Sequence, residues 1–104
     1  MDKQEEITFL REQLGAKLVG YIGSATSTKT VSNWIEGQET PSADAVARLS
    51  EAYDIALRLS VRYAPVTIQA WMTGSEDPSV IPAPARVLRE GSKVERDELH
   101  FRPF

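Results

Sequence analysis

The sequence predicts an all-α fold of about seven short helices, arranged as a bundle followed by a small helical C-terminal lobe. Three observations lead to this prediction. Strand signals are almost absent, apolar residues recur at helical spacing, and glycine, proline and serine stand where helices begin or end. A chain of 104 residues is long enough for one compact domain, or for two lobes that share a core.

The first two predicted helices are joined by a single glycine. In residues 3–14 acidic side chains stand near the N-terminal end, and Gly15 is the stop signal. Residues 16–22 form a shorter helix. The glycines Gly20 and Gly23 lower its helix propensity, so we expect another helix to pack closely against it. The predicted apolar positions of both helices are Ile7, Leu10, Leu14, Leu18, Val19 and Ile22.

The third predicted helix has an apolar side and a polar side. It begins after Ser27, a residue type that caps helices well, and stops at Gly37. Val31, Trp34 and Ile35 form its apolar side. We expect these three residues to anchor the helix to the bundle, with hydroxyl, amide and lysine side chains on the other side.

The longest predicted helix spans residues 43–62 and follows a second serine cap, Ser42. Its wide apolar face is expected to lie in the core. The positions on this face are Ala45, Val46, Leu49, Ala52, Tyr53, Ala56, Leu57 and Leu59. The large aromatic residues on apolar stripes are also expected in the core, namely Tyr21, Trp34, Tyr53 and Trp71.

Three further helices complete the predicted fold. Residues 65–73 and 84–90 each open with a proline, whose missing N–H is not needed in a first helical turn. Ser92 and Glu95 have the spacing of a capping box, which predicts a last helix over residues 93–99.

The composition argues against several classes of function. There is no cysteine and only one histidine, His100, so we expect no catalytic residues, no metal site, no cofactor and no enzymatic activity. No apolar run is long enough for a membrane helix, and the acidic start lacks a secretion signal, so we expect a cytoplasmic protein without a membrane partner. The formal net charge of −3 argues weakly against a general nucleic-acid binder.

Residues 16–37 nevertheless have the organisation of a helix-turn-helix, whose second helix lies in the DNA major groove. Hydroxyl, amide and lysine side chains suit phosphates and base edges, and an asparagine can bind the N6 and N7 atoms of adenine. The N–H groups at the start of the helix also suit a phosphate. The candidate DNA-binding residues are Ser27, Thr28, Lys29, Thr30, Ser32, Asn33 and Gln38. Basic residues are few here, so we expect binding to depend on a dimer or a partner.

The stretch TVSNWIEGQETPS, residues 30–42, resembles Xre-type (Cro/repressor-like) domains. In these domains an apolar residue and a tryptophan in the recognition helix precede a glycine and a proline-containing loop. The turn before this helix is about one residue longer here than in the tightest family members, and its usual glycine is displaced. The resemblance implies a helix-turn-helix DNA-binding domain over residues 1–62.

The stretch QAWMTGSEDPSVIPAPARVLREG, residues 69–91, resembles the helical domain that follows the helix-turn-helix in Xre/MbcA/ParS-like antitoxins. The loop departs from the family pattern, with Asp77 where asparagine is usual and Pro82 where glycine is common. This second resemblance implies an antitoxin-type helical domain over residues 63–104.

Together the resemblances imply double-stranded operator DNA and a toxin as partners. Antitoxins of this family neutralise a RES-domain toxin that degrades NAD, by covering its active site with their C-terminal region, and they repress their own operon. The candidate toxin-binding residues are Glu98, Leu99, His100, Phe101, Arg102, Pro103 and Phe104. Phenylalanine and arginine are effective anchors at protein interfaces.

Two other interpretations stay open. The chain could be a stand-alone helix-turn-helix transcriptional regulator of phage or plasmid type, whose C-terminal lobe serves dimerisation. It could also be an interaction adaptor that no longer binds DNA. Helix-turn-helix proteins usually bind DNA as two-fold dimers, so a homodimer is expected in either DNA-binding case.

Overall fold

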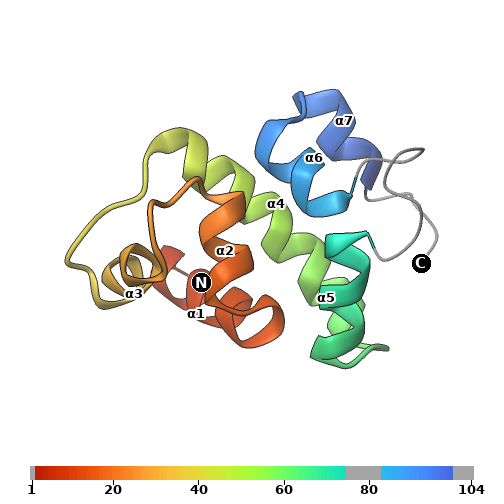
Figure 1. The fold of residues 1–104 in the computed structure, drawn as a ribbon, viewed down its shortest axis with the longest axis horizontal. Helices are drawn as coiled ribbons and strands as arrows, with labels where there is room; N and C mark the ends of the chain where they lie inside the picture. The colour runs from red at the N-terminus through yellow and green to blue at the C-terminus, as the bar shows by residue number, and fades with distance from the viewer. Residues whose placement is uncertain (1, 75–82, 100–104) are drawn as a thin grey trace.

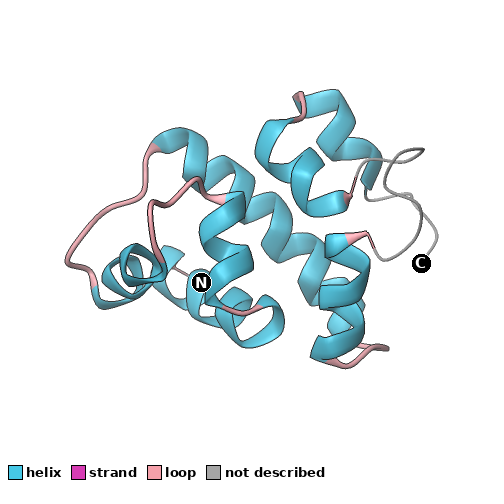
Figure 2. Ribbon diagram, viewed as in Figure 1, coloured by secondary structure: helices cyan, strands magenta, loops and turns pink. Residues whose placement is uncertain are grey.

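The computed structural model describes residues 2–74 and 83–99. Within these residues the regular elements are all α-helices, which confirms the predicted all-α fold (Figure 2). The described residues form seven helices: α1 (Lys3–Leu14), α2 (Ala16–Ile22), α3 (Thr28–Glu36), α4 (Ala43–Ser60), α5 (Pro65–Thr73), α6 (Pro84–Glu90) and α7 (Lys93–Glu98).

The helix boundaries follow the local sequence with two differences: α7 ends at Glu98, one residue before its predicted end, and α4 also ends early. This helix ends at Ser60, two residues before the predicted end. The carbonyl of Leu59 accepts hydrogen bonds from both the Arg62 and the Tyr63 N–H groups, at 3.0 and 2.9 Å. Because this shared acceptor tightens the last turn, the α-helical pattern stops before the proline that opens α5.

The helices pack around one hydrophobic cluster. Figure 1 shows α4 running through the middle of the molecule, with α3 toward one end and α5 to α7 toward the other. Val31 of α3, Ile68 of α5 and Leu88 of α6 are all fully buried members of the cluster. The core therefore extends across the boundary predicted between residues 62 and 63.

Two residues predicted in the core are exposed instead. Leu57 is 44% exposed: it lies about 100° from Ala56 on one side, and the buried stripe extends to the other side. Ile55, on that other side, is buried at 3%. Tyr21 is 37% exposed, and its ring faces the guanidinium group of Arg89.

Candidate functional site

Helix α3 is fixed to the bundle by its apolar side. Val31 is fully buried and Trp34 is 6% exposed, and both belong to the central cluster. Outside this stripe Thr28 and Lys29 are exposed, and Ser32 is half-buried. Helix α3 lies at one end of the molecule (Figure 1). Its exposed residues are polar, and its apolar stripe holds it in place.

The turn between α2 and α3 is closed by short contacts. The Ala25 N–H donates to the Gly20 carbonyl at 2.8 Å, and Ser24 has a left-handed backbone with a φ of 58°. A methyl group at Gly23 would come within 2.9 Å of the Trp34 ring, whereas one at Gly20 would meet its nearest neighbour at 3.4 Å. The close packing of a helix against α2 that the sequence predicts therefore requires the glycine at position 23. At Gly20 a methyl group would fit at ordinary contact distance.

The candidate DNA-binding residues all lie in α3 or within two residues of it. Ser27 occupies the N-cap position, but its side chain makes no capping hydrogen bond, so the side-chain cap expected from the sequence is not formed. The first-turn N–H groups of α3 therefore have no side-chain cap. Ser27, Thr28, Lys29 and Gln38 are exposed, and Thr30, Ser32 and Asn33 are half-buried.

The amide of Asn33 is held by Glu39, a residue that is not among the DNA-binding candidates predicted from the sequence. Its Nδ2 donates to Oε2 of Glu39 at 2.6 Å. Glu39 lies beyond the end of α3, where its spacing from Asn33 does not match a helical face. The signal that could have found it is Gly37, because a chain that leaves a helix through a left-handed glycine folds back over the last turn.

The exposed charges at this surface are divided between the two ends of α3. Lys29 lies in the first turn, whereas Glu36 and Glu39 lie at the other end. The N-terminal part of a recognition helix makes the base contacts, and the helix dipole is also positive there. A DNA contact at the start of α3 would therefore meet the favourable charge, whereas one made by Asn33 would lie beside the carboxylate of Glu39.

The candidate toxin-binding residues are described only in part. Glu98 is exposed at the end of α7, whereas Leu99 is 2% exposed and packs in the central cluster. The Leu99 side chain thus anchors α7 in this structure and is not presented to a partner. The remaining candidates lie outside the described residues, namely His100, Phe101, Arg102, Pro103 and Phe104. The loop that carries Asp77 and Pro82 also lies outside them.

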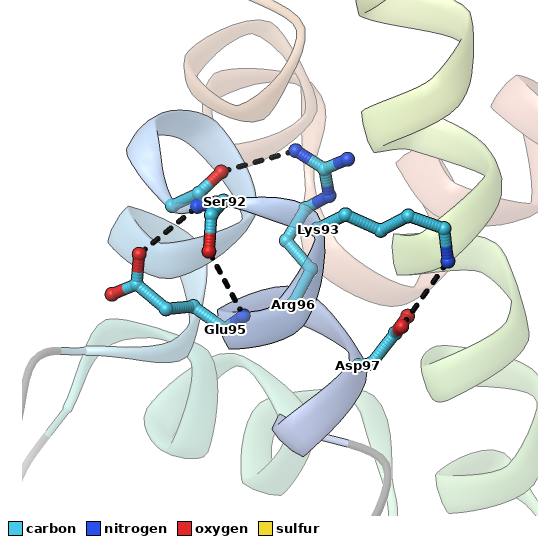
Figure 3. A network of polar contacts seen from close by, with 6 residues as sticks. Ser92, Lys93, Glu95, Arg96 and Asp97 are labelled. Carbon is cyan, nitrogen blue, oxygen red and sulfur yellow. Dashed lines mark hydrogen bonds and ion pairs between the residues drawn. The ribbon is translucent and has the colours of Figure 1, made fainter.

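Helix α7 itself is held by polar contacts (Figure 3). The Ser92 N–H donates to Glu95 Oε1 at 3.0 Å, and the Glu95 N–H donates to Ser92 Oγ at 3.2 Å, which is the predicted capping box. The Ser92 N–H, and after it the Ser92 hydroxyl, hold the pKa of the Glu95 carboxyl below its ordinary value, against a slight desolvation. Lys93 and Asp97 form an exposed ion pair at 3.1 Å.

Two arginines join other helices to the C-terminal end of α2. The Arg89 guanidinium of α6 lies 4.6 Å from the centre of the Tyr21 ring, and its Nη1 donates to the Tyr21 carbonyl at 3.2 Å. Arg48 Nε of α4 donates to the Ile22 carbonyl at 3.1 Å. Both cations satisfy carbonyls at the negative end of the α2 dipole. The C-terminal segment therefore contacts the bundle beside the turn that leads into α3.

An open depression of about 590 Å³ lies between the start of α1 and the loop after α3. Lys3 and Glu6 line it from α1, and Trp34, Gly37 and Glu39 line it from the other side. Within residues 2–74 and 83–99, no three acidic or histidine side chains are placed to hold a metal ion.

Comparison with protein family models, with curated proteins and with solved structures gives no match to this chain. In the described part of the chain, no helix is both long and apolar enough to cross a membrane.

Proposed function

We propose that this protein is a sequence-specific DNA-binding protein in which α3 enters the major groove. The observation that carries the proposal is the two-sided arrangement of α3. Val31 and Trp34 are buried in the apolar stripe, and Thr28, Lys29 and Ser32 lie outside it with hydroxyl and ammonium groups suited to phosphates and base edges. The N–H groups at the uncapped start of α3 add further donors for a phosphate.

The charge distribution sets the expected strength of this binding. Lys29 is the one basic residue within α3, and the net charge of the chain is −3. Each phosphate contact by Lys or Arg contributes roughly −0.9 to the slope of log K against log salt, so few contacts give a shallow slope. We therefore expect a single chain to bind weakly and a dimer on two half-sites to bind firmly.

A binding assay on DNA from upstream of the protein's own gene tests this proposal. The wild-type protein is expected to bind with nanomolar affinity, and the double variant Lys29→Ala, Asn33→Ala to lose this binding. Lys93→Ala is the matched control, because it removes the same charge from α7 and leaves the α3 surface intact. Retention of full affinity by the double variant would refute the role of α3.

We further propose, from the resemblance of residues 69–91 and the tail, that the protein is an antitoxin that neutralises a RES-domain, NAD-degrading toxin and represses its own operon. Leu99 is buried beside the exposed Glu98, so the chain is anchored to the bundle directly before residues 100–104, which hold the other candidate toxin-binding residues. The alternative is a stand-alone regulator without a toxin partner.

Co-expression with the product of the adjacent gene separates these two possibilities. An antitoxin is expected to co-purify with that product and to suppress its NAD-degrading activity. A variant that ends at Leu99 is expected to lose the partner and to keep its DNA binding. If the adjacent product neither co-purifies nor degrades NAD, the stand-alone regulator is the correct reading.

A further inference from the structure

The way the chain leaves α3 returns it to the helix surface. Gly37 has a φ of 79°, a left-handed conformation that favours glycine. The Asn33 carbonyl then accepts hydrogen bonds from the Gln38 N–H at 2.9 Å and from the Glu39 N–H at 3.3 Å. Gln4 of α1 closes over this glycine, since a methyl group at Gly37 would lie 2.6 Å from Gln4 Nε2. The backbone of Glu39 is therefore held next to Asn33 independently of their side chains.

The side chains of the two residues are also joined. Asn33 Nδ2 lies 2.6 Å from Glu39 Oε2. An ionised carboxylate only accepts hydrogen bonds, so it selects the NH₂ side of the amide and fixes which way the amide group faces. One N–H of Asn33 is used in this contact. Among residues 2–74 and 83–99 the second N–H and Oδ1 have no partner, so both remain for a contact with DNA.

What remains on Asn33 matches one base. Adenine presents an acceptor, N7, beside a donor, the N6 amino group, in the major groove. A bidentate contact needs the amide oxygen and one amide N–H, so the other N–H can stay on Glu39. Guanine presents two acceptors at the same edge, O6 and N7, and would leave Oδ1 facing an acceptor.

We propose that Glu39 is a positioning residue for DNA recognition, which holds the Asn33 amide in the orientation that reads adenine. This inference rests on the proposed DNA-binding function and extends it to a residue outside α3. Glu39 also carries a negative charge at an exposed position, which repels phosphates. It therefore raises the discrimination between bases while it lowers affinity for DNA of every sequence.

Two substitutions at Glu39 separate positioning from charge. Glu39→Gln and Glu39→Ala remove the same charge, but only the glutamine keeps an oxygen that accepts the Asn33 N–H. Binding sites are first selected from random duplex DNA by the wild-type protein. The adenine that Asn33 contacts is identified as the position at which Asn33→Ala loses the base preference. The affinity of each variant is then measured for the selected site and for the same site with guanine in place of this adenine.

The wild-type protein is expected to prefer adenine by about fivefold or more at this position. Glu39→Gln is expected to keep that preference, and Glu39→Ala is expected to prefer adenine by about twofold or less. Both variants should bind non-specific DNA more tightly than the wild type, and to a similar degree. Equal preference in Glu39→Ala and the wild type would overturn the inference. So would an equal loss in both variants, because that result assigns the effect to charge. If the wild type selects no DNA sequence, the proposed DNA-binding function itself is refuted. This result differs from the two above, in which the protein binds DNA but Glu39 does not position Asn33.

Discussion

Helices α3 and α7 are both short, and both belong to segments for which we propose a binding partner, but they are held in different ways. Helix α3 places two buried side chains, Val31 and Trp34, in the central cluster. Helix α7 contributes no buried residue within its own span and relies on its capping box and surface ion pair, with Leu99 buried just after it. Buried aromatic and aliphatic side chains stabilise by several kcal/mol, whereas an exposed ion pair contributes about 0–1 kcal/mol. We therefore expect α3 to be a rigid platform and α7 to be the more easily displaced helix.

The largest expected effect is at Trp34. Trp34→Ala removes a ring that packs against Gly23 and the central cluster, and we expect it to lower the free energy of unfolding by about 3–5 kcal/mol. Val94→Ala in α7 is the matched apolar control. Because Val94 is 68% exposed, the change there should stay within about 0.5 kcal/mol. Urea unfolding measures both values, and similar values for the two variants would remove the contrast between α3 and α7.

The second largest change in stability is expected in the turn before α3. Gly23→Ala forces a methyl group to within 2.9 Å of the Trp34 ring, so we expect a destabilisation of about 1–3 kcal/mol. Gly20→Ala places its methyl group at ordinary contact distance from Val31 and improves helix propensity. That control variant should therefore be neutral, or more stable by up to about 1 kcal/mol. The reverse order of the two midpoints in urea would show that the ring does not pack against Gly23 as described.

A smaller effect is expected at the start of α7. Ser92→Ala removes the side-chain half of the capping box, which costs about 1 kcal/mol at a typical N-cap. Hydrogen exchange is expected to quicken at the α7 amides and to stay unchanged in α3, because the loss is local. Uniform quickening across both helices would indicate that α7 unfolds only together with the bundle.

The smallest effect is a pH dependence at Glu95. The folded-state pKa of this carboxyl is lowered, first by the Ser92 N–H and then by the Ser92 hydroxyl, so its contribution to stability is present above the ordinary glutamate pKa of about 4.5. That contribution is lost as the pH falls through the lower folded-state value. Between about pH 6 and pH 3, the wild type should therefore lose more stability than Glu95→Gln. Parallel losses in the two proteins would mean that the capping box does not favour the ionised carboxylate.

The positions of the helices could be predicted from local signals, because those signals act within a few residues. Pro65 and Pro84 mark the first turns of α5 and α6, Gly37 marks the end of α3, and Ser42 caps α4. Such signals depend on one residue and the few backbone groups beside it, as where the Ser42 hydroxyl accepts from the Ala45 N–H. This is why the predicted boundaries agree with the structure to within about two residues.

Features that depend on the third dimension could not be predicted in the same way. Leu57 follows Tyr53 at helical spacing, but the buried stripe of α4 extends toward Ile55 instead, and that direction is set by the packing of the whole bundle. The sequence does not reveal that Gly23 is closely packed while Gly20 has room, because the difference comes from the position of the Trp34 ring. Glu39 was missed because a turn, and no helical face, brings it to Asn33.

The salt dependence of DNA binding by Lys29→Ala tests the central claim, that the polar surface of α3 contacts DNA, most directly. The affinity for a selected site is measured over a range of salt concentrations for the wild type, for Lys29→Ala and for the control Lys93→Ala. We predict that Lys29→Ala binds more weakly and that its slope of log K against log salt is shallower by about 0.9 per protomer, which is the loss of one phosphate contact. Lys93→Ala should retain the wild-type slope. Identical slopes and affinities for the two lysine variants would contradict the assignment of α3 to the DNA.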